Sequence, residues 1–119
     1  MLKNKYDFMQ KITPQMRAVA EKVRAWNAAH PERVNDYRSD YLAERKFWNE
    51  GGPVMAKVEE FDVPGGPTEK VNVRLHYPTL DKNLPILVFI HGGGFTLGNN
   101  DTHSRVMRIL AQKTGCCVI

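Results

Sequence analysis

The sequence has few cysteines and no apolar run long enough to cross a membrane. Its only two cysteines, Cys116 and Cys117, are adjacent, and a disulfide between neighbouring residues would be strained, so two free thiols are expected. The longest apolar run falls far short of the ~20 residues that a membrane-spanning helix needs. The N-terminus has lysines but neither an apolar signal core nor a small-residue cleavage site. These absences favour a cytoplasmic protein with no membrane partner.

Charge of one sign is not concentrated anywhere in the chain. The 119 residues include 17 Lys and Arg against 13 Asp and Glu, interleaved, for a formal net charge of +4. No dense basic run or basic–aromatic alternation is present, so nucleic acid is not an expected partner. The hydrophobic fraction of 42% is typical of a globular chain with one modest domain.

Two helical segments are expected in the first 50 residues. Thr13 and Pro14 predict the start of the first, because Thr caps free backbone N–H groups and Pro suits the first helical position. Pro31 ends it. Apolar residues recur between them at intervals of three and four, namely Met16, Val19, Ala20, Val23 and Trp26.

The second helix is expected from about Val34 to Asn49, and the Gly-Gly-Pro sequence at 51–53 stops it. It carries Tyr37, Tyr41 and Trp48 on roughly one face, which suits either core packing or a surface facing a substrate. Residues 1–50 are therefore predicted to be a helical segment and residues 51–119 a separate sheet-containing part.

The next segments, "MAKVEEFDVP" and "KVNVRLHYP", are rich in β-formers and predict a hairpin. Their alternation places Val71, Val73 and Leu75 on one face and Asn72, Arg74 and His76 on the other. His76 is thus expected at solvent or at a sheet edge, without a catalytic role.

The rest of the chain predicts a strand–turn–helix–strand unit. "LPILVFI" at 84–90 is an unbroken apolar run, which is typical of a strand buried on both faces in a parallel sheet. The following helix is expected to use Asn100 or Asp101 as its cap and to end at Gly115. "CCVI" is the next strand, so the class is α/β. The helix should bury an apolar stripe of Val106, Ile109 and Leu110.

Between that strand and helix lies the most distinctive segment, "HGGGFTLGNNDTH" at 91–103. A dinucleotide fingerprint fails because its last glycine position falls on Leu97. A phosphate P-loop fails because Asn99 and Asn100 follow Gly98, where Lys and Ser or Thr are needed. A phosphate at the helix N-terminus stays physically possible. The third chemistry is an oxyanion hole, in which backbone N–H groups stabilise the negative oxygen formed during acyl transfer.

"HGGGF" after an apolar strand resembles the bacterial hormone-sensitive-lipase-like branch of the α/β-hydrolase family. "LGNNDTH" and the upstream "ERKFWNEGGPVMA" support the resemblance, which covers Tyr41 to Ile119 and extends more loosely to the N-terminal helices. It implies a fold with a helical cap segment, an antiparallel hairpin and the start of a parallel sheet. It also implies hydrolysis of short-chain, acetyl-type esters by Ser-His-Asp acyl-enzyme chemistry, with no cofactor and no metal.

Carried over by position, the resemblance assigns the oxyanion N–H groups to Gly93 and Gly94, while Gly92 and His91 shape the loop. Phe95 and Leu97 become candidate walls of the substrate pocket. For Phe95, packing in the core is an equally good interpretation.

The nucleophile is missing from these residues. The only two serines, Ser39 and Ser104, are flanked by charged residues or histidine, and neither lies in a Gly-x-Ser-x-Gly elbow. Ser104 and His103 are neighbours, yet adjacent helical residues point apart, so His103 is expected to cap the helix or face solvent. The nucleophile, acid and base are therefore expected beyond residue 119, in the remainder of the same hydrolase.

Other sites are disfavoured, and two alternatives stay open. His76, His91 and His103 lack the spacing of metal ligands, and the cysteines lie in an apolar run without a base nearby. The alternatives are a binding or regulatory fragment that keeps the pocket without the chemistry, and a phosphate-binding loop. A homo-oligomer is possible. Incompletely covered strands should also leave open edges and exposed apolar faces.

Overall fold

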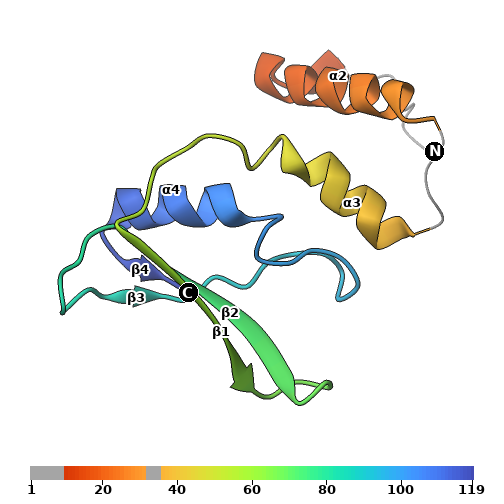
Figure 1. The fold of residues 1–119 in the computed structure, drawn as a ribbon. Coiled ribbons are helices and arrows are strands. Elements are labelled where there is room, and N and C mark those ends of the chain that lie inside the picture. Colours follow the sequence, from red (N-terminus) through yellow and green to blue (C-terminus); the bar gives the residue numbers. More distant parts are fainter. Residues whose placement is uncertain (1–9, 32–35) are drawn as a thin grey trace. The chain divides into compact units, whose positions relative to one another are not determined.

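The computed structural model describes residues 10–31 and 36–119. The chain divides into two units, residues 1–36 and 37–119, and each is described by itself. The second unit holds the sheet, its helices and the glycine loop (Figure 1). The boundary expected near residue 50, between a helical cap segment and the sheet-containing core, remains a prediction.

In the first unit, helix α2 spans Pro14–Ala29. Thr13 is its cap, as predicted, because its Oγ1 accepts a hydrogen bond of 3.2 Å from the N–H of Met16. His30 ends the helix one residue before Pro31, and its ring stacks on Trp26 with 4.3 Å between centroids. The apolar stripe is only partly covered, since no residue of α2 is buried among the described residues.

In the second unit, helix α3 spans Tyr37–Lys46, within the predicted range, while the expected start at Val34 lies outside the described residues. Two turns then lead to the Gly-Gly-Pro segment. The aromatic residues do not form a common buried face: Tyr37 is largely exposed, and Tyr41 lies under the Arg45 guanidinium at 4.8 Å.

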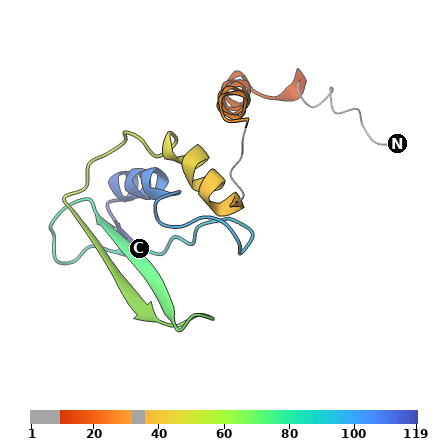
Figure 2. The same ribbon diagram turned by 45° about the vertical axis from the view of Figure 1, so that its right-hand side comes forward.

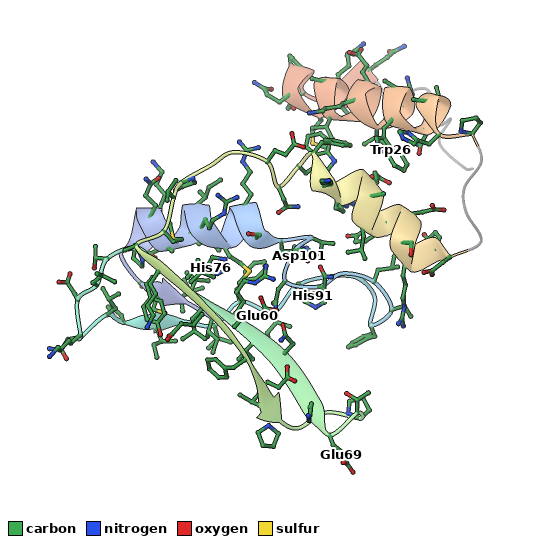
Figure 3. The ribbon with its side chains drawn as sticks, in the orientation of Figure 1. Trp26, Glu60, Glu69, His76, His91 and Asp101 are labelled. Carbon is green, nitrogen blue, oxygen red and sulfur yellow. The ribbon has the colours of Figure 1, made fainter. Side chains whose placement is uncertain are left out.

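The four described strands form one sheet in the order β1-β2-β4-β3. Strands β1 (Lys57–Pro64) and β2 (Lys70–Tyr77) form the predicted antiparallel hairpin, with Glu69 at its tip (Figure 3). The short strands β3 (Ile86–Leu87) and β4 (Cys117–Val118) pair in parallel, which confirms the predicted β–turn–α–β unit and the α/β class.

Helix α4 spans Ser104–Thr114 and lies across one face of this sheet (Figure 1). Gly115 ends it in a left-handed conformation with φ of 70°, as predicted. The predicted start was wrong, because neither Asn100 nor Asp101 caps the helix. The first turn is instead capped from far away in the sequence: the N–H of Arg105 donates to Oδ1 of Asn49 at 3.0 Å.

The predicted apolar stripe of α4 was wrong at Val106 and Ile109, whereas Leu110 packs against the core cluster as expected. The buried residues are Met107 and Ala111, which pack with Val118, whereas Val106 and Ile109 are exposed and Leu110 is half-buried. The helix carries two apolar rows on neighbouring faces, and sequence periodicity alone does not say which one meets the sheet. The row that packs against the sheet is the one with Met107 and Ala111, each of which lies one residue after a member of the predicted stripe.

The run at 84–90 is not buried on both faces in the part of the chain that the structure describes. Leu87 and Phe89 pack against the core cluster, while Ile86, Val88 and Ile90 point the other way and are 68%, 70% and 87% exposed. Within the second unit, α4 therefore covers one face of the sheet and the apolar residues of the other face are exposed. The exposed apolar face predicted for an incompletely covered sheet is present.

His76 is 1% exposed, so its predicted position at solvent or an edge was wrong. It lies opposite Val118 in the sheet, on the face that α4 covers (Figure 3). The polar residues of β2 thus face the helix. Burial, followed by the nearby positive charges of Arg74 and Arg108, lowers the pKa of His76, which keeps its imidazole neutral.

We expect this buried imidazole to make the fold sensitive to acid. The unfolded chain takes up a proton near the ordinary histidine pKa of about 6.5, whereas the folded state resists protonation of His76. Above the ordinary histidine pKa, His76 is neutral in both states and the fold keeps its full stability. As the pH falls toward and through the lowered pKa of the folded state, the unfolded chain is protonated first and this stability is lost. Urea unfolding at pH 7.5 and at pH 5.5 should show this loss, and His76→Leu should reduce it. An equal pH dependence in His76→Leu would contradict the prediction.

Candidate functional site

The glycine loop at 91–98 folds back on itself directly after the third strand region. The N–H groups of Thr96 and Leu97 both donate to the carbonyl oxygen of Gly93, at 3.2 and 2.9 Å. Gly93, Gly94 and Phe95 all have positive φ, at 148°, 59° and 62°. This closed turn requires backbone conformations that residues with a Cβ rarely adopt.

Two glycines are required by space as well as by conformation. A Cβ added at Gly93 would collide with the carbonyl oxygen of Leu97. One added at Gly98 would lie 2.7 Å from the carbonyl oxygen of Gly92 and 2.9 Å from Nδ1 of His91. Gly92, in contrast, has a free space around its Cα and no positive φ. The loop therefore closes only with glycine at 93 and 98.

The backbone N–H groups of Gly93 and Gly94 take part in none of the hydrogen bonds among the described residues. Both belong to the residues that line a cavity of about 700 Å³. Unused donors on a cavity wall are what stabilisation of an oxyanion requires. The roles predicted for these two glycines are compatible with this geometry and stay predictions.

Phe95 projects fully into solvent from its left-handed position. It therefore does not pack in the core of the described residues, and the alternative interpretation of this residue as a core residue was wrong. A non-glycine residue with positive φ is uncommon and costs free energy, so it is often found at functional sites. Leu97 is half-buried. Both residues line the cavity, which suits their predicted role as pocket walls.

The cavity also has a wall that the sequence did not predict. Helix α3 contributes Arg38 and Leu42, which are separated by one helical turn and share a face. Ile90 and the loop form the other side; the loop residues are His91, Gly92, Gly93, Gly94, Phe95, Thr96, Leu97, Gly98 and Asn99. The i, i+4 spacing of Arg38 and Leu42 was visible in the sequence, but nothing there related it to the loop.

The rings of His91 and His103 stack with 5.6 Å between their centroids, and the Phe89 ring lies 6.0 Å from that of His103. Nδ1 of His91 is 3.0 Å from the carbonyl oxygen of Gly92, so the His91 ring contacts the loop backbone, as its predicted bracing role requires. His103 occupies the N-cap position of α4, as expected, but its side chain makes no capping bond and is half-buried, so the expected exposure to solvent was wrong. Its Nδ1 is paired with Oγ1 of Thr102 at 2.8 Å, and burial followed by the charge of His91 lowers its pKa.

Two ladders of polar side chains attach the segment after the loop to the hairpin. Nδ2 of Asn100 donates to Oδ1 of Asn72 at 2.7 Å, and Asn72 in turn donates to Asp62. Asp101 pairs with Arg74 at 2.8 Å, next to Glu60 (Figure 3).

These ladders explain Asn100 and Asp101 of the motif, which were expected from the sequence to cap the helix. The only sequence signal for these contacts was the alternation in β2, which placed Asn72 and Arg74 on one face. Their partners in the loop could be found only in three dimensions.

Among the described residues, no helix is long and apolar enough to span a membrane. The described residues also hold no group of three or more His, Cys, Asp or Glu side chains placed to bind a metal ion.

Comparison with known proteins shows what the chain is similar to. A family model described as alpha/beta hydrolase fold matches residues 87–119, which include the glycine loop. The acetyl esterase of Salmonella schwarzengrund (strain CVM19633) is 39% identical over 120 residues, covering 98% of this chain and 36% of the relative. The acetyl esterase of Salmonella agona (strain SL483) is 38% identical with the same coverage. The chain thus spans about a third of the length of the curated relatives it matches.

Solved structures agree. An esterase from Pyrobaculum calidifontis superposes with a TM-score of 0.70 at 28% sequence identity, covering 90% of this chain and 33% of that one. An alpha/beta hydrolase enzyme from the metagenome of Lake Arreo, Spain, gives a TM-score of 0.72 at 27% identity, covering 90% and 36%. As the HGGGF motif predicted, the chain has an α/β-hydrolase-like fold, and over the third of their length that it spans it is similar to bacterial acetyl esterases.

Proposed function

We propose that this chain supplies the oxyanion loop and one wall of the substrate cavity of a carboxylic ester hydrolase that acts on short-chain, acetyl-type esters. One observation carries the proposal: the N–H groups of Gly93 and Gly94 have no hydrogen-bond partner among the described residues, and both glycines line a cavity in an α/β-hydrolase fold. Similarity to acetyl esterases and to solved esterases supports the reaction class. The loop geometry supports the assignment of roles.

The chemistry of this half of the site follows from its dipoles. When an ester carbonyl is attacked, its oxygen becomes negative, and fixed N–H donors stabilise that charge at no cost of reorganisation. The closed turn at Gly93 holds the donors in place before the substrate binds. Removal of one such donor typically lowers kcat by about 10²–10³. His91 braces the loop through its contact with the Gly92 carbonyl oxygen and takes no part in proton transfer.

The cap and the pocket walls are part of the same proposal. Residues 1–50 contribute to a cap, and residues 51–119 to the catalytic core, with Arg38 and Leu42 of α3 facing the loop across the cavity. Phe95 and Leu97 contact the acyl or alcohol part of the ester. The nucleophile, acid and base are supplied by the remainder of the hydrolase, because neither Ser39 nor Ser104 lies in an elbow.

Hydrolysis of p-nitrophenyl acetate tests the proposal. The protein is expressed from its own gene, and residues 1–119 are assayed separately. We expect activity from the former and none from the latter. Replacement of both Ser39 and Ser104 with alanine should leave the activity of the former unchanged. Activity of residues 1–119 that survives the double replacement would refute this division of the site, and an inactive gene product would favour a binding or regulatory role.

A further inference from the structure

Asn49 is the residue with the most complete set of long-range hydrogen bonds in the described part of the chain. Its Nδ2 donates to the carbonyl oxygens of Arg45 and Thr102, each at 2.9 Å. Its Oδ1 accepts from the N–H of Arg105 at 3.0 Å. A single amide side chain therefore joins the end of α3, the turn after the glycine loop and the first turn of α4.

Arg108 makes the same connection from the α4 side. Its Nη2 donates to the carbonyl oxygen of Asn49 and its Nη1 to that of Pro53, both at 3.0 Å. The N–H of Asn49 donates to Lys46 at 3.1 Å, so every polar group of Asn49 is bonded. The chain between α3 and β1 is thus held against α4 by backbone and side chain together.

This junction controls the position of one cavity wall. α3 and the first turn of α4 lie side by side at the junction (Figure 2). The cavity-lining residues Arg38 and Leu42 lie on the same helix, at seven to eleven residues from Asn49. A helix rises about 1.5 Å per residue, so a small tilt at the held end becomes a displacement of an ångström or more at the lining residues.

The opposite wall depends on the same amide. Thr102 follows the glycine loop, is buried, and closes a turn with Asn99, which itself lines the cavity. Asn49 is bonded to the carbonyl oxygen of Thr102 and to that of Arg45, so it sets the spacing between the loop and α3. Helix capping alone would need only its Oδ1.

We propose that Asn49 is a positioning residue that sets the width of the cavity between α3 and the oxyanion loop, and thereby the size of ester that the enzyme accepts. The inference rests on the proposed esterase function. It assigns to Asn49 no contact with substrate; its effect is exerted through Leu42, Arg38 and the loop.

The test compares Asn49→Asp with Asn83→Asp in the protein expressed from its own gene. Aspartate keeps the acceptor for the Arg105 N–H and is as good a helix cap as asparagine, but it lacks both N–H donors. Asn83 is exposed in the loop before β3, so its replacement makes the same change of charge away from the cavity. The readout is the ratio of kcat/KM for p-nitrophenyl acetate to that for p-nitrophenyl hexanoate.

We expect Asn49→Asp to lower this ratio by about tenfold, because two lost hydrogen bonds release the α3 wall, and Asn83→Asp to leave it unchanged. Hydrogen exchange of residues 37–46 should accelerate in Asn49→Asp only. If Asn49→Asp fails to fold, Asn49→Ser, which also caps a helix, carries the same test.

A wild-type ratio in a folded Asn49 variant would overturn the inference while leaving the esterase function intact. A wild-type protein without hydrolytic activity would overturn the proposed function first, and this inference with it. Accelerated exchange together with an unchanged ratio would reduce Asn49 to a structural residue and would also overturn the proposal.

Discussion

Gly93→Ala is expected to lower kcat for p-nitrophenyl acetate by at least about 10²–10³, the loss produced by removal of one oxyanion donor. The methyl group would collide with the carbonyl oxygen of Leu97, and φ of 148° is unfavourable for alanine. The turn must therefore open, and the N–H groups of Gly93 and Gly94 move together. Because these donors act mainly in the transition state, KM should change much less than kcat.

Gly92→Ala is the matched control for this variant. Gly92 lies next to Gly93 in the same loop, yet a Cβ there meets no atom within 4 Å and its φ is not positive. We expect its kcat to stay within a few-fold of the wild-type value. Steady-state kinetics of both variants, with circular dichroism to confirm folding, checks the pair. Equal losses of kcat in the two variants would contradict the prediction, because the loop would then tolerate no side chain for a reason unrelated to the closed turn at Gly93.

Met107→Ala is expected to lower the free energy of unfolding by about 2–5 kcal/mol, the usual range for removal of a large buried side chain. Met107 is 3% exposed and packs with Ala111 and Val118 at the centre of the small core between α4 and the sheet. Its removal leaves a cavity where the helix meets β4. Chemical denaturation of the protein expressed from its own gene measures the change.

Val106→Ala provides the control in the neighbouring position. Val106 belongs to the stripe that sequence periodicity favoured, but in the structure it is 40% exposed. Its replacement should cost less than about 1 kcal/mol, because most surface substitutions have small effects. If Val106→Ala were instead the more damaging of the two, the orientation of α4 described here would be wrong and the orientation expected from the sequence would be right.

Under the proposed function, the glycine loop is one side of an active site. In that proposal Gly93 and Gly94 stabilise charge, and Arg38 and Leu42, which line the same cavity, form a wall. Neither serine of the chain is placed to attack an ester. The ladders from Asp62 and Glu60 of β1 show why the segment after the glycines is so polar: it is held by the hairpin and by Asn49. The segment after the glycines is therefore anchored to both the hairpin and the end of α3.

The sequence by itself determined the elements whose signals are local. Thr13 and Gly115 mark helix ends because a hydroxyl cap and a left-handed glycine act within a few residues of themselves. The hairpin followed from alternation, and the parallel strands from two apolar runs that flank a helix. The glycine loop was predicted from its consecutive glycines, because only an unusual backbone conformation requires residues without a Cβ. These features give the fold class and the position of the candidate site.

Only the tertiary structure decided which faces meet. His76 is buried and Val106 is exposed because α4 packs on the polar face of β2 and presents its Met107 row to β4. Asn49 caps α4 from 56 residues away, and Leu42 reaches the cavity from a helix that no motif connects to the loop. Such choices depend on contacts between residues far apart in the chain, which periodicity and spacing do not record.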